Sequence, residues 1–297
     1  MILSWIKAFR LRTLPLAFSS IIMGTAITHQ YFNWVIFSFS ILTTLFLQVL
    51  SNLANDYGDF KKGTDNDDRV GPDRAMQSGE ISNHQMKIGI IIFVILSLIS
   101  GLTLVFYATR NTNIIYPVGF VLLGLLSILA AINYTMGEGA YGYKGWGDIF
   151  VFLFFGIVGV VGTGFLFSQK LDILYFFPAV TIGCFSSAVL NLNNMRDIKN
   201  DKACGKRTLV VKLGLRKAKI YHQIIIISGM ILSLLYFVLR GGSLINSIYI
   251  LSYIPFIIHL LRVRKITESK GFDPELKKVA FSTFAFSLLF WFSIYIN

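Results

Sequence analysis

The sequence predicts an all-α integral membrane protein in which nine transmembrane helices form a single polytopic domain over residues 1–297. Hydrophobic residues make up 55% of the chain and charged residues only 14%, whereas soluble globular proteins carry about a quarter charged residues. Apolar runs of about 18 or more residues recur, and each can cross a hydrocarbon core about 30 Å thick. The nine runs lie near residues 14–30, 34–54, 88–109, 113–135, 147–168, 174–195, 220–239, 243–261 and 279–296.

The distribution of basic residues predicts how the chain is oriented. If the N-terminus lies inside, the inner segments hold 24 of the 27 lysines and arginines, and the outer segments hold only Arg110, Lys170 and Arg240. Because inner loops are enriched in these residues, we predict a multi-pass protein of the cell (inner) membrane with a cytoplasmic N-terminus and an outer C-terminus. Topology thus explains the net charge of +12. The chain carries no nucleic-acid-binding motif, so we predict no nucleic-acid partner.

The cysteines and histidines carry no predicted function. Cys184 falls within a span and Cys204 in an inner loop, so we interpret both as free thiols. The four histidines show no metal-ligand spacing.

Glycines are concentrated in and before the fifth span. The preceding loop, residues 134–148, combines Gly with Tyr and Trp, which fits a flexible loop at the mouth of a cavity as well as a tight connection. Within the span, Gly156, Gly159, Gly162 and Gly164 predict close helix packing.

The second span ends in polar and acidic residues. Asn52, Asn55, Asp56 and Asp59 recur at spacings of three and four, so they share one face of the helix end. Polar side chains at membrane depth are costly and usually face a cavity or a partner. In the loop that follows, we interpret residues 67–69, which are Asp67, Asp68 and Arg69, as solvated loop charges.

The sixth span ends in a second acidic stretch. Asp197 and Asp201 are four residues apart, so on a continuing helix they lie on one face, with Arg196 and Lys206 among the basic residues around them. Two carboxylates this close repel each other unless a divalent cation lies between them, and oxygen ligands suit Mg²⁺. The basic residues can bind an anion that the cation bridges, typically a phosphate.

The two acidic stretches form a repeat. Each ends a span with asparagines, places acidic residues three or four apart and adds basic residues, and the two lie four spans from each other. Such duplication predicts two pseudo-repeated halves with a shared site at their junction. The chemistry that this site supports is metal-assisted departure of diphosphate from a membrane-embedded substrate. The alternative from a different class is a divalent-cation transporter, which needs polar residues deep within the spans, whereas here they gather at one end.

The chain resembles the UbiA-type intramembrane aromatic prenyltransferases, and within them the 1,4-dihydroxy-2-naphthoate polyprenyltransferase branch. The resemblance covers nearly the whole chain. The motifs that carry it are Asn52-x-x-Asn55-Asp56-x-x-Asp59 with Gly63-x-Asp65, Asn193-Asn194-x-Arg196-Asp197-x-x-x-Asp201-x-x-x-Gly205-Lys206-x-Thr208-Leu209, Arg12-Thr13-Leu14-Pro15 and the segment Gly147–Gly156.

The resemblance implies nine helices around a central cavity and Mg²⁺-dependent transfer of a polyprenyl chain from polyprenyl diphosphate. The implied aromatic acceptor is 1,4-dihydroxy-2-naphthoate, prenylated with loss of CO₂ to give demethylmenaquinone in menaquinone biosynthesis; another acceptor, such as 4-hydroxybenzoate, remains the alternative. It also implies the residue roles. The expected metal ligands and catalytic residues are Asp56, Asp59, Asp197 and Asp201, and the expected substrate-binding residues are Asn52, Asn55, Lys61, Arg74, Asn193, Arg196 and Lys206.

Overall fold

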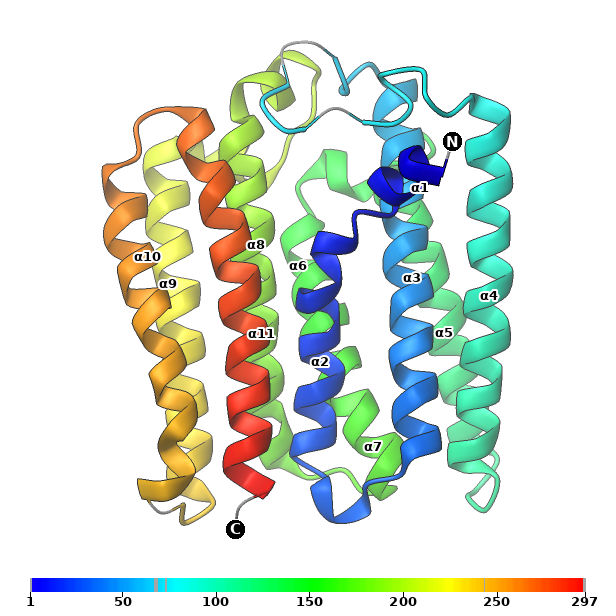
Figure 1. Ribbon diagram of the computed structural model, residues 1–297, viewed down its shortest axis with the longest axis vertical. Helices are drawn as coiled ribbons and strands as arrows, with labels where there is room; N and C mark the ends of the chain where they lie inside the picture. Colours follow the sequence, from blue (N-terminus) through cyan, green and yellow to red (C-terminus); the bar gives the residue numbers. More distant parts are fainter. Residues whose placement is uncertain (1, 67–68, 73, 243, 296–297) are drawn as a thin grey trace.

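The computed structural model describes residues 2–66, 69–72, 74–242 and 244–295. Across these ranges the chain is helical or irregular and contains no β-strand. Figure 1 shows long helices that run side by side along one axis, with short connections at both ends. The prediction of an all-α protein is confirmed.

The helical segments follow the predicted order. The helices that run along the bundle are α2 (Leu14–Ala26), α3 (Trp34–Lys61), α4 (Asn83–Thr109), α5 (Ile115–Asn133), α8 (Phe176–Ala203), α9 (Leu209–Leu239), α10 (Tyr253–Lys265) and α11 (Asp273–Tyr295). Between α5 and α8 lies one continuous helical segment made of α6 (Gly147–Val151), the π-helix η4 (Phe152–Gly162) and α7 (Thr163–Ser168). The shorter pieces are α1 (Ile2–Phe9) and the 3₁₀ segments η1 (Leu11–Thr13), η2 (His29–Tyr31), η3 (Tyr141–Lys144), η5 (Ile173–Tyr175), η6 (Leu244–Ser252) and η7 (Ser269–Phe272).

Eight of the predicted spans are confirmed as helical segments long and apolar enough to cross a membrane, counted over the described ranges. The first predicted span is shorter than expected: α2 has 13 residues and ends at Ala26, because the chain turns through η2 before α3 begins. The protein is thus a multi-pass membrane protein. Figure 1 places the two termini at opposite ends of the bundle, while the assignment of the N-terminal end to the cytoplasm stays a prediction.

The helices that carry the acidic residues continue beyond their apolar runs. α3 extends to Lys61 and α8 to Ala203, so all four predicted aspartates lie on regular helix. Both helices end on the same side of the bundle, which we call the acidic end. The loop between α3 and α4 covers this end in Figure 1.

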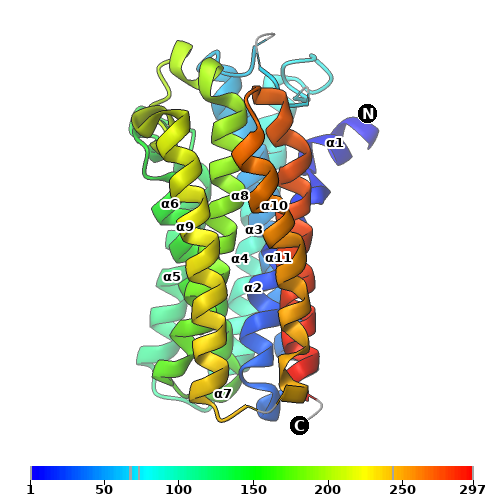
Figure 2. The same ribbon diagram turned by 90° about the vertical axis from the view of Figure 1, so that its left-hand side faces the viewer.

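Helix α8 lies at the centre of the fold. Its side chains Ile182, Phe185 and Leu192 are fully buried in a core that also draws on α9, α10 and α11. A second core around Leu50 and Leu53 joins α3 to α1 and α4. Figure 2 shows α8 behind α9 and α10, with α1 projecting from the bundle. The acidic end of α8 is therefore held in place by apolar packing on several sides.

Two histidines that are far apart in sequence meet between α9, α10 and α11. His222 Nε2 lies 2.7 Å from His259 Nε2, and His259 Nδ1 lies 2.6 Å from Glu275 Oε2. Lys278 also bonds Glu275. His222, His259 and Glu275 are all buried. This hydrogen-bonded network therefore joins the three helices through polar contacts that the sequence spacing did not predict.

Close packing is confirmed at two of the four glycines of the fifth span. A Cβ on Gly156 would lie 2.6 Å from Ala179 O of α8, and one on Gly159 would lie 2.6 Å from Ser20 Cβ of α2. At Gly162 and Gly164 the nearest atoms are 3.8 Å and 3.4 Å away, which is ordinary contact. For those two positions the prediction was wrong.

We expect Gly156→Ala to lower the free energy of unfolding by about 1–3 kcal/mol relative to Gly162→Ala, because the added methyl collides with the α8 backbone. Both substitutions gain the same helix propensity, so their difference isolates the packing contact. The measurement is thermal unfolding of the two purified variants in one detergent. Equal melting temperatures would contradict the packing interpretation.

Candidate active site

A polar cavity of about 780 Å³ opens at the acidic end. It brings together nine of the eleven predicted site residues, which are Asn55, Asp56, Asp59, Arg74, Asn193, Arg196, Asp197, Asp201 and Lys206. The acidic ends of α3 and α8 therefore face one common space.

Two predicted residues do not line this cavity. Lys61 is exposed because α3 is still helical at this position, and two residues after Asp59 correspond to about 200° of rotation around the helix. Asn52 lines the adjoining apolar cavity instead, and its Nδ2 donates to Phe9 O at 2.9 Å and to Thr13 Oγ1 at 3.1 Å. Its amide thereby anchors the turn that leads into α2.

Asp56 is held by two arginines from different segments. Its Oδ1 accepts from Arg74 Nη1 at 2.7 Å and from Arg10 Nη2, and its side chain is 1% exposed. The other oxygen, Oδ2, is buried and has no hydrogen-bond partner among the described residues. A buried carboxylate oxygen without a partner is costly, so this atom is a ready ligand for a cation.

Asp59 contacts residues from two other segments at the acidic end. Tyr143 of η3 donates its hydroxyl to Asp59 Oδ1 at 2.8 Å, and Lys206 Nζ lies 3.3 Å from the same oxygen. Burial alone lowers the pKa of Lys206, but the neighbouring Asp59 and Asp201 outweigh it and raise that pKa above its ordinary value. Lys206 therefore stays charged in the cavity.

Asp197 forms a bidentate pair with the residue before it. Arg196 Nε lies 2.9 Å from Asp197 Oδ1 and Arg196 Nη2 lies 2.7 Å from Asp197 Oδ2. The same guanidinium reaches Asp273 of α11 at 2.7 Å and Asn193 Oδ1 at 2.9 Å. Paired and hydrogen-bonded on several sides, this arginine has a fixed position.

Several contacts join the two acidic stretches to each other. Asn200 Nδ2 donates to Thr64 O at 2.7 Å, and Arg69 Nη2 lies 3.9 Å from Asp197 Oδ2. Together with the pair between Lys206 and Asp59, these contacts connect the end of α3 and its following loop to the end of α8 and its following loop.

Arg69 corrects one prediction. Its side chain is 7% exposed and its Nε lies 3.3 Å from Asp65 Oδ1, so its interpretation as a solvated loop charge was wrong. Packing of the loop over the acidic end buries it. Asp67 and Asp68 lie outside the described residues.

Sequence reasoning missed other members of the site. Arg10 reaches Asp56 from the N-terminal turn, where its backbone is left-handed at φ 49°. Tyr143 in η3 and Asp273 at the start of α11 come from segments far along the chain. Tyr143 had a usable signal, because a position at the mouth of a cavity was one of two interpretations of its loop. Arg10 also had one, since it directly precedes the segment that contains the Arg12-Thr13-Leu14-Pro15 motif. Asp273 required knowledge of the tertiary contacts.

The donor atoms of the cavity suit a hard divalent cation bound together with an anion. The described residues contain no cluster of three or more His, Cys, Asp or Glu side chains preassembled around a metal position. The carboxylates instead lie around the cavity, and its described lining holds eight basic and seven acidic side chains. Because these charges nearly balance, a diphosphate with several negative charges needs additional positive charge, which a cation on the aspartate oxygens supplies.

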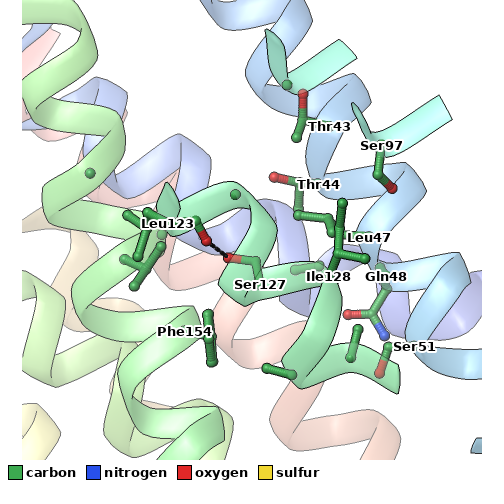
Figure 3. A pocket seen from close by; sticks show the side chains of 18 of the residues that line it. Thr43, Thr44, Leu47, Gln48, Ser51, Ser97, Leu123, Ser127, Ile128 and Phe154 are labelled. Atoms are coloured by element: carbon green, nitrogen blue, oxygen red, sulfur yellow. Dashed lines mark hydrogen bonds between the residues drawn. The ribbon is translucent and has the colours of Figure 1, made fainter. Parts of the chain in front are cut away.

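An apolar cavity of about 530 Å³ adjoins the polar one. Figure 3 shows Phe154 on one side of it, with Thr44, Leu47 and Gln48 of α3 on the other. No charged side chain among the described residues lines it. The two cavities share lining residues and so lie next to each other, a charged one beside an apolar one, which is the division that an amphipathic ligand requires.

Comparison with known proteins gives matches over nearly the whole chain. Residues 17–294 match the UbiA prenyltransferase family. The chain is 39% identical over 290 residues to a 1,4-dihydroxy-2-naphthoate octaprenyltransferase of Haemophilus influenzae, with 96% of this chain and 94% of that protein covered. It is also 39% identical over 297 residues to the Escherichia coli protein of the same name, with 99% and 96% covered.

The fold has a solved counterpart. A UbiA homologue from Aeropyrum pernix superposes with a TM-score of 0.70 at 13% identity, covering 97% of this chain and 98% of that one. The resemblance drawn from the two acidic motifs is therefore confirmed. The chain belongs to the UbiA prenyltransferase family and is a membrane prenyltransferase.

Proposed function

We propose that this protein is a 1,4-dihydroxy-2-naphthoate polyprenyltransferase that transfers a polyprenyl chain from polyprenyl diphosphate and releases diphosphate and CO₂. The observation that carries the proposal is that a charged cavity lies directly beside an apolar one and shares lining residues with it. A polyprenyl diphosphate has this same division between a charged head and a hydrocarbon tail. The names of the two relatives that are 39% identical support the acceptor.

The basic residues of the cavity bind the diphosphate in this proposal. Arg10, Arg74, Arg196 and Lys206 come from four separate segments and surround the polar space. Guanidinium and ammonium groups stabilise the charge that develops on a departing diphosphate.

Mg²⁺ is the proposed metal. Asp56 and Asp59 on α3 and Asp197 and Asp201 on α8 would hold it, because these four of the seven acidic side chains that line the polar cavity come in pairs from the acidic ends of the two helices. The unpartnered Oδ2 of Asp56 fits such a ligand. When bound, the metal neutralises diphosphate oxygens and makes diphosphate a better leaving group.

The proposed reaction replaces the carboxylate of the acceptor ring by the prenyl chain. The bond between the first prenyl carbon and a diphosphate oxygen breaks, and its electron pair leaves with diphosphate. A π electron pair of the acceptor ring forms the new carbon–carbon bond at the position that carries the carboxylate. The bond between the ring carbon and the carboxylate carbon then breaks, its electron pair restores the aromatic ring, and CO₂ leaves. The product is the reduced form of demethylmenaquinone.

The chain residues have distinct tasks in this reaction. The arginines and Lys206 orient the diphosphate, and the apolar cavity takes the tail and excludes water from the reacting carbon. The tail then lies in the hydrocarbon layer with membrane lipid, and the acidic end faces the cytoplasm of a cell (inner) membrane, with the N-terminus on that side.

The transporter alternative finds little support in the fold. The titratable side chains of the site lie at the acidic end, and the adjoining cavity has an uncharged lining over the described residues. A path for a divalent cation across the membrane is expected to carry acidic ligands along its length, and the hydroxyl and amide side chains of the adjoining cavity are not a substitute for them.

Purified protein in detergent is expected to release diphosphate from labelled polyprenyl diphosphate only when Mg²⁺ and an acceptor are present. Removal of the metal with EDTA should stop turnover, and added Mg²⁺ should restore it. An acceptor panel tests the branch: 1,4-dihydroxy-2-naphthoate should be prenylated in preference to 4-hydroxybenzoate. Preference for 4-hydroxybenzoate would reassign the acceptor, and absence of diphosphate release with every acceptor would overturn the enzyme proposal.

A further inference from the structure

Tyr143 connects the two acidic stretches from outside the cavities. It belongs to η3, between α5 and α6, and is not among the described residues that line the polar or the apolar cavity. Its hydroxyl donates to Asp59 Oδ1 at 2.8 Å, and its backbone oxygen accepts from Arg207 N at 2.9 Å. Tyr143 therefore contacts the end of α3 and the loop after α8 without lining the space for the substrate.

The Tyr143 hydroxyl is a directed link in a chain of hydrogen bonds. Its oxygen lies 2.6 Å from Thr64 Oγ1 and 2.8 Å from Asp59 Oδ1. An ionised carboxylate only accepts hydrogen bonds and a phenol has a single hydrogen, so Tyr143 donates to Asp59 and Thr64 donates to Tyr143. Burial, followed by the charge of Asp59, raises the pKa of the Tyr143 hydroxyl above its ordinary value. The phenol therefore keeps the hydrogen that it donates.

Thr64 is itself fixed from two sides, so the chain of hydrogen bonds starts at a buried residue in a defined position. Thr64 N donates to Asp59 O at 2.9 Å, and Thr64 O accepts from Asn200 Nδ2 at 2.7 Å. Asn200 directly precedes Asp201 on α8. The hydrogen bonds thus form one path from the end of α8 through Thr64 and Tyr143 to Asp59.

The Tyr143 ring contacts the lysine of the polar cavity. Lys206 Nζ lies over this ring, 5.0 Å from its centroid, and 3.3 Å from Asp59 Oδ1. A cation within about 6 Å of an aromatic face is attracted by it. One side chain thus fixes an anion with its hydroxyl and contacts a cation with its ring.

We propose that Tyr143 is a positioning residue of the site: its hydroxyl fixes the Asp59 carboxylate, and its ring keeps Lys206 beside that carboxylate. The proposal rests on the proposed function, in which Asp59 holds the metal and Lys206 binds the diphosphate.

The two oxygens of Asp59 differ in their contacts. Oδ1 accepts from Tyr143 and lies near Lys206, whereas Oδ2 has only a longer contact among the described residues, 3.4 Å from Lys206 Nζ. Oδ2 is therefore the oxygen that stays available to a cation. Removal of a partner that orients a metal-ligating group typically costs roughly tenfold to a hundredfold in metal affinity or activity.

The test separates the hydroxyl of Tyr143 from its ring. Tyr143→Phe removes only the hydroxyl, Thr64→Val removes the donor before it, and Tyr143→Leu removes the ring as well. Tyr141→Phe is the matched control for metal binding. Tyr141 lies in the same short helix, and its hydroxyl donates to Ala130 O at 2.9 Å instead of to a carboxylate.

Three measurements are made on each full-length variant in one detergent. Electron paramagnetic resonance gives the affinity for Mn²⁺, used as a probe for Mg²⁺, in the presence of inorganic diphosphate. Initial rates give the Mg²⁺ concentration for half-maximal turnover and the KM for polyprenyl diphosphate at saturating Mg²⁺. Thermal unfolding of the same samples reports whether the variants fold.

Tyr143→Phe should weaken Mn²⁺ binding and raise the Mg²⁺ concentration for half-maximal turnover, each about tenfold. Its KM for polyprenyl diphosphate should stay within about twofold of wild type, because the ring under Lys206 is kept, whereas Tyr143→Leu should raise this KM about threefold. Thr64→Val should weaken Mn²⁺ binding less than Tyr143→Phe does. Thr64→Ser, which keeps the hydroxyl, and the control Tyr141→Phe should bind Mn²⁺ as the wild type does.

Wild-type Mn²⁺ affinity in both Tyr143→Phe and Thr64→Val would overturn the inference. A lower melting temperature without weaker metal binding would also overturn it, since Tyr143 would then be a structural contact only. The same holds if Tyr141→Phe weakens Mn²⁺ binding as much as Tyr143→Phe does. Weaker binding in Tyr143→Phe, combined with a wild type that prenylates no aromatic acceptor, would support the positioning role and refute the proposed function instead.

Discussion

Asp56→Ala and Asp197→Ala are each expected to reduce turnover by roughly a thousandfold or more, because each removes a carboxylate that would hold the metal and its diphosphate. Asp56 is also the common partner of Arg10 and Arg74, so its loss removes a close carboxylate from two arginines of the site and leaves Arg74 with Asp65 alone among the described residues. The measurement is diphosphate release by purified variants at saturating substrate, beside the fraction of each variant found in the membrane.

Two controls separate this effect from misfolding. Asp56→Asn keeps the side-chain volume but removes the charge, so it should be nearly as inactive as Asp56→Ala while inserting normally. Asp172→Ala removes an aspartate from the opposite end, where Asp172 pairs with Arg240 at 2.7 Å and both side chains are about a third or more exposed. Such exposed pairs contribute little, so this variant should keep wild-type activity.

The double variant of Asp56 and Asp197 gives a sharper test of one shared site. If both carboxylates bind the same metal diphosphate, their losses are not independent, and the double variant should be hardly slower than either single variant. Near-normal turnover in either single variant would rule out the metal role. Losses that multiply would instead indicate two separate sites.

The sequence was sufficient for the fold because the bilayer permits few alternatives. A segment that crosses hydrocarbon must satisfy its backbone hydrogen bonds internally, so apolar length alone identified the helices. Where the prediction failed, as in the short α2, the chain makes a local turn that hydropathy does not register. The continuation of α3 and α8 beyond their apolar runs followed from the spacing of the aspartates, which suits a helical face.

The candidate site could be predicted only where its residues recur at helical spacing within one segment. Spacings of three and four placed Asp56 beside Asp59 and Asp197 beside Asp201, and the structure brings all four to one cavity. The arginines were harder, since a charged residue in a loop looks the same whether it is solvated or folded over a site. Arg69 is of the second kind, as its 7% exposed side chain beside Asp65 demonstrates.

Lys61 illustrates the opposite error. Its place directly after the acidic stretch made it a candidate for diphosphate, but helical geometry directs it away from the cavity, and its Nζ lies 5.9 Å from the ring of Tyr57 instead. Lys206 comes from a different loop and reaches Asp59. Adjacency in sequence therefore did not place Lys61 in the polar cavity, whereas Lys206 lines it.

These two lysines provide the second large prediction. Lys206→Met should lower kcat/KM for polyprenyl diphosphate by about a hundredfold, because it removes a cation from the diphosphate site and leaves Asp59 with Tyr143 as its remaining close partner. Lys61→Met makes the same chemical change on an exposed side chain and should leave kcat/KM within about twofold of wild type. Both are measured from initial rates at limiting polyprenyl diphosphate.

The dependence on salt distinguishes a direct contact with diphosphate from a general effect of surface charge. Added salt screens exposed charges much more than buried ones, and Lys206 is 9% exposed. The hundredfold ratio between wild type and Lys206→Met should therefore persist at high ionic strength. A ratio that collapses with salt, or a Lys61→Met variant as impaired as Lys206→Met, would show that net positive charge at the acidic end, rather than a lysine fixed beside Asp59, attracts the substrate.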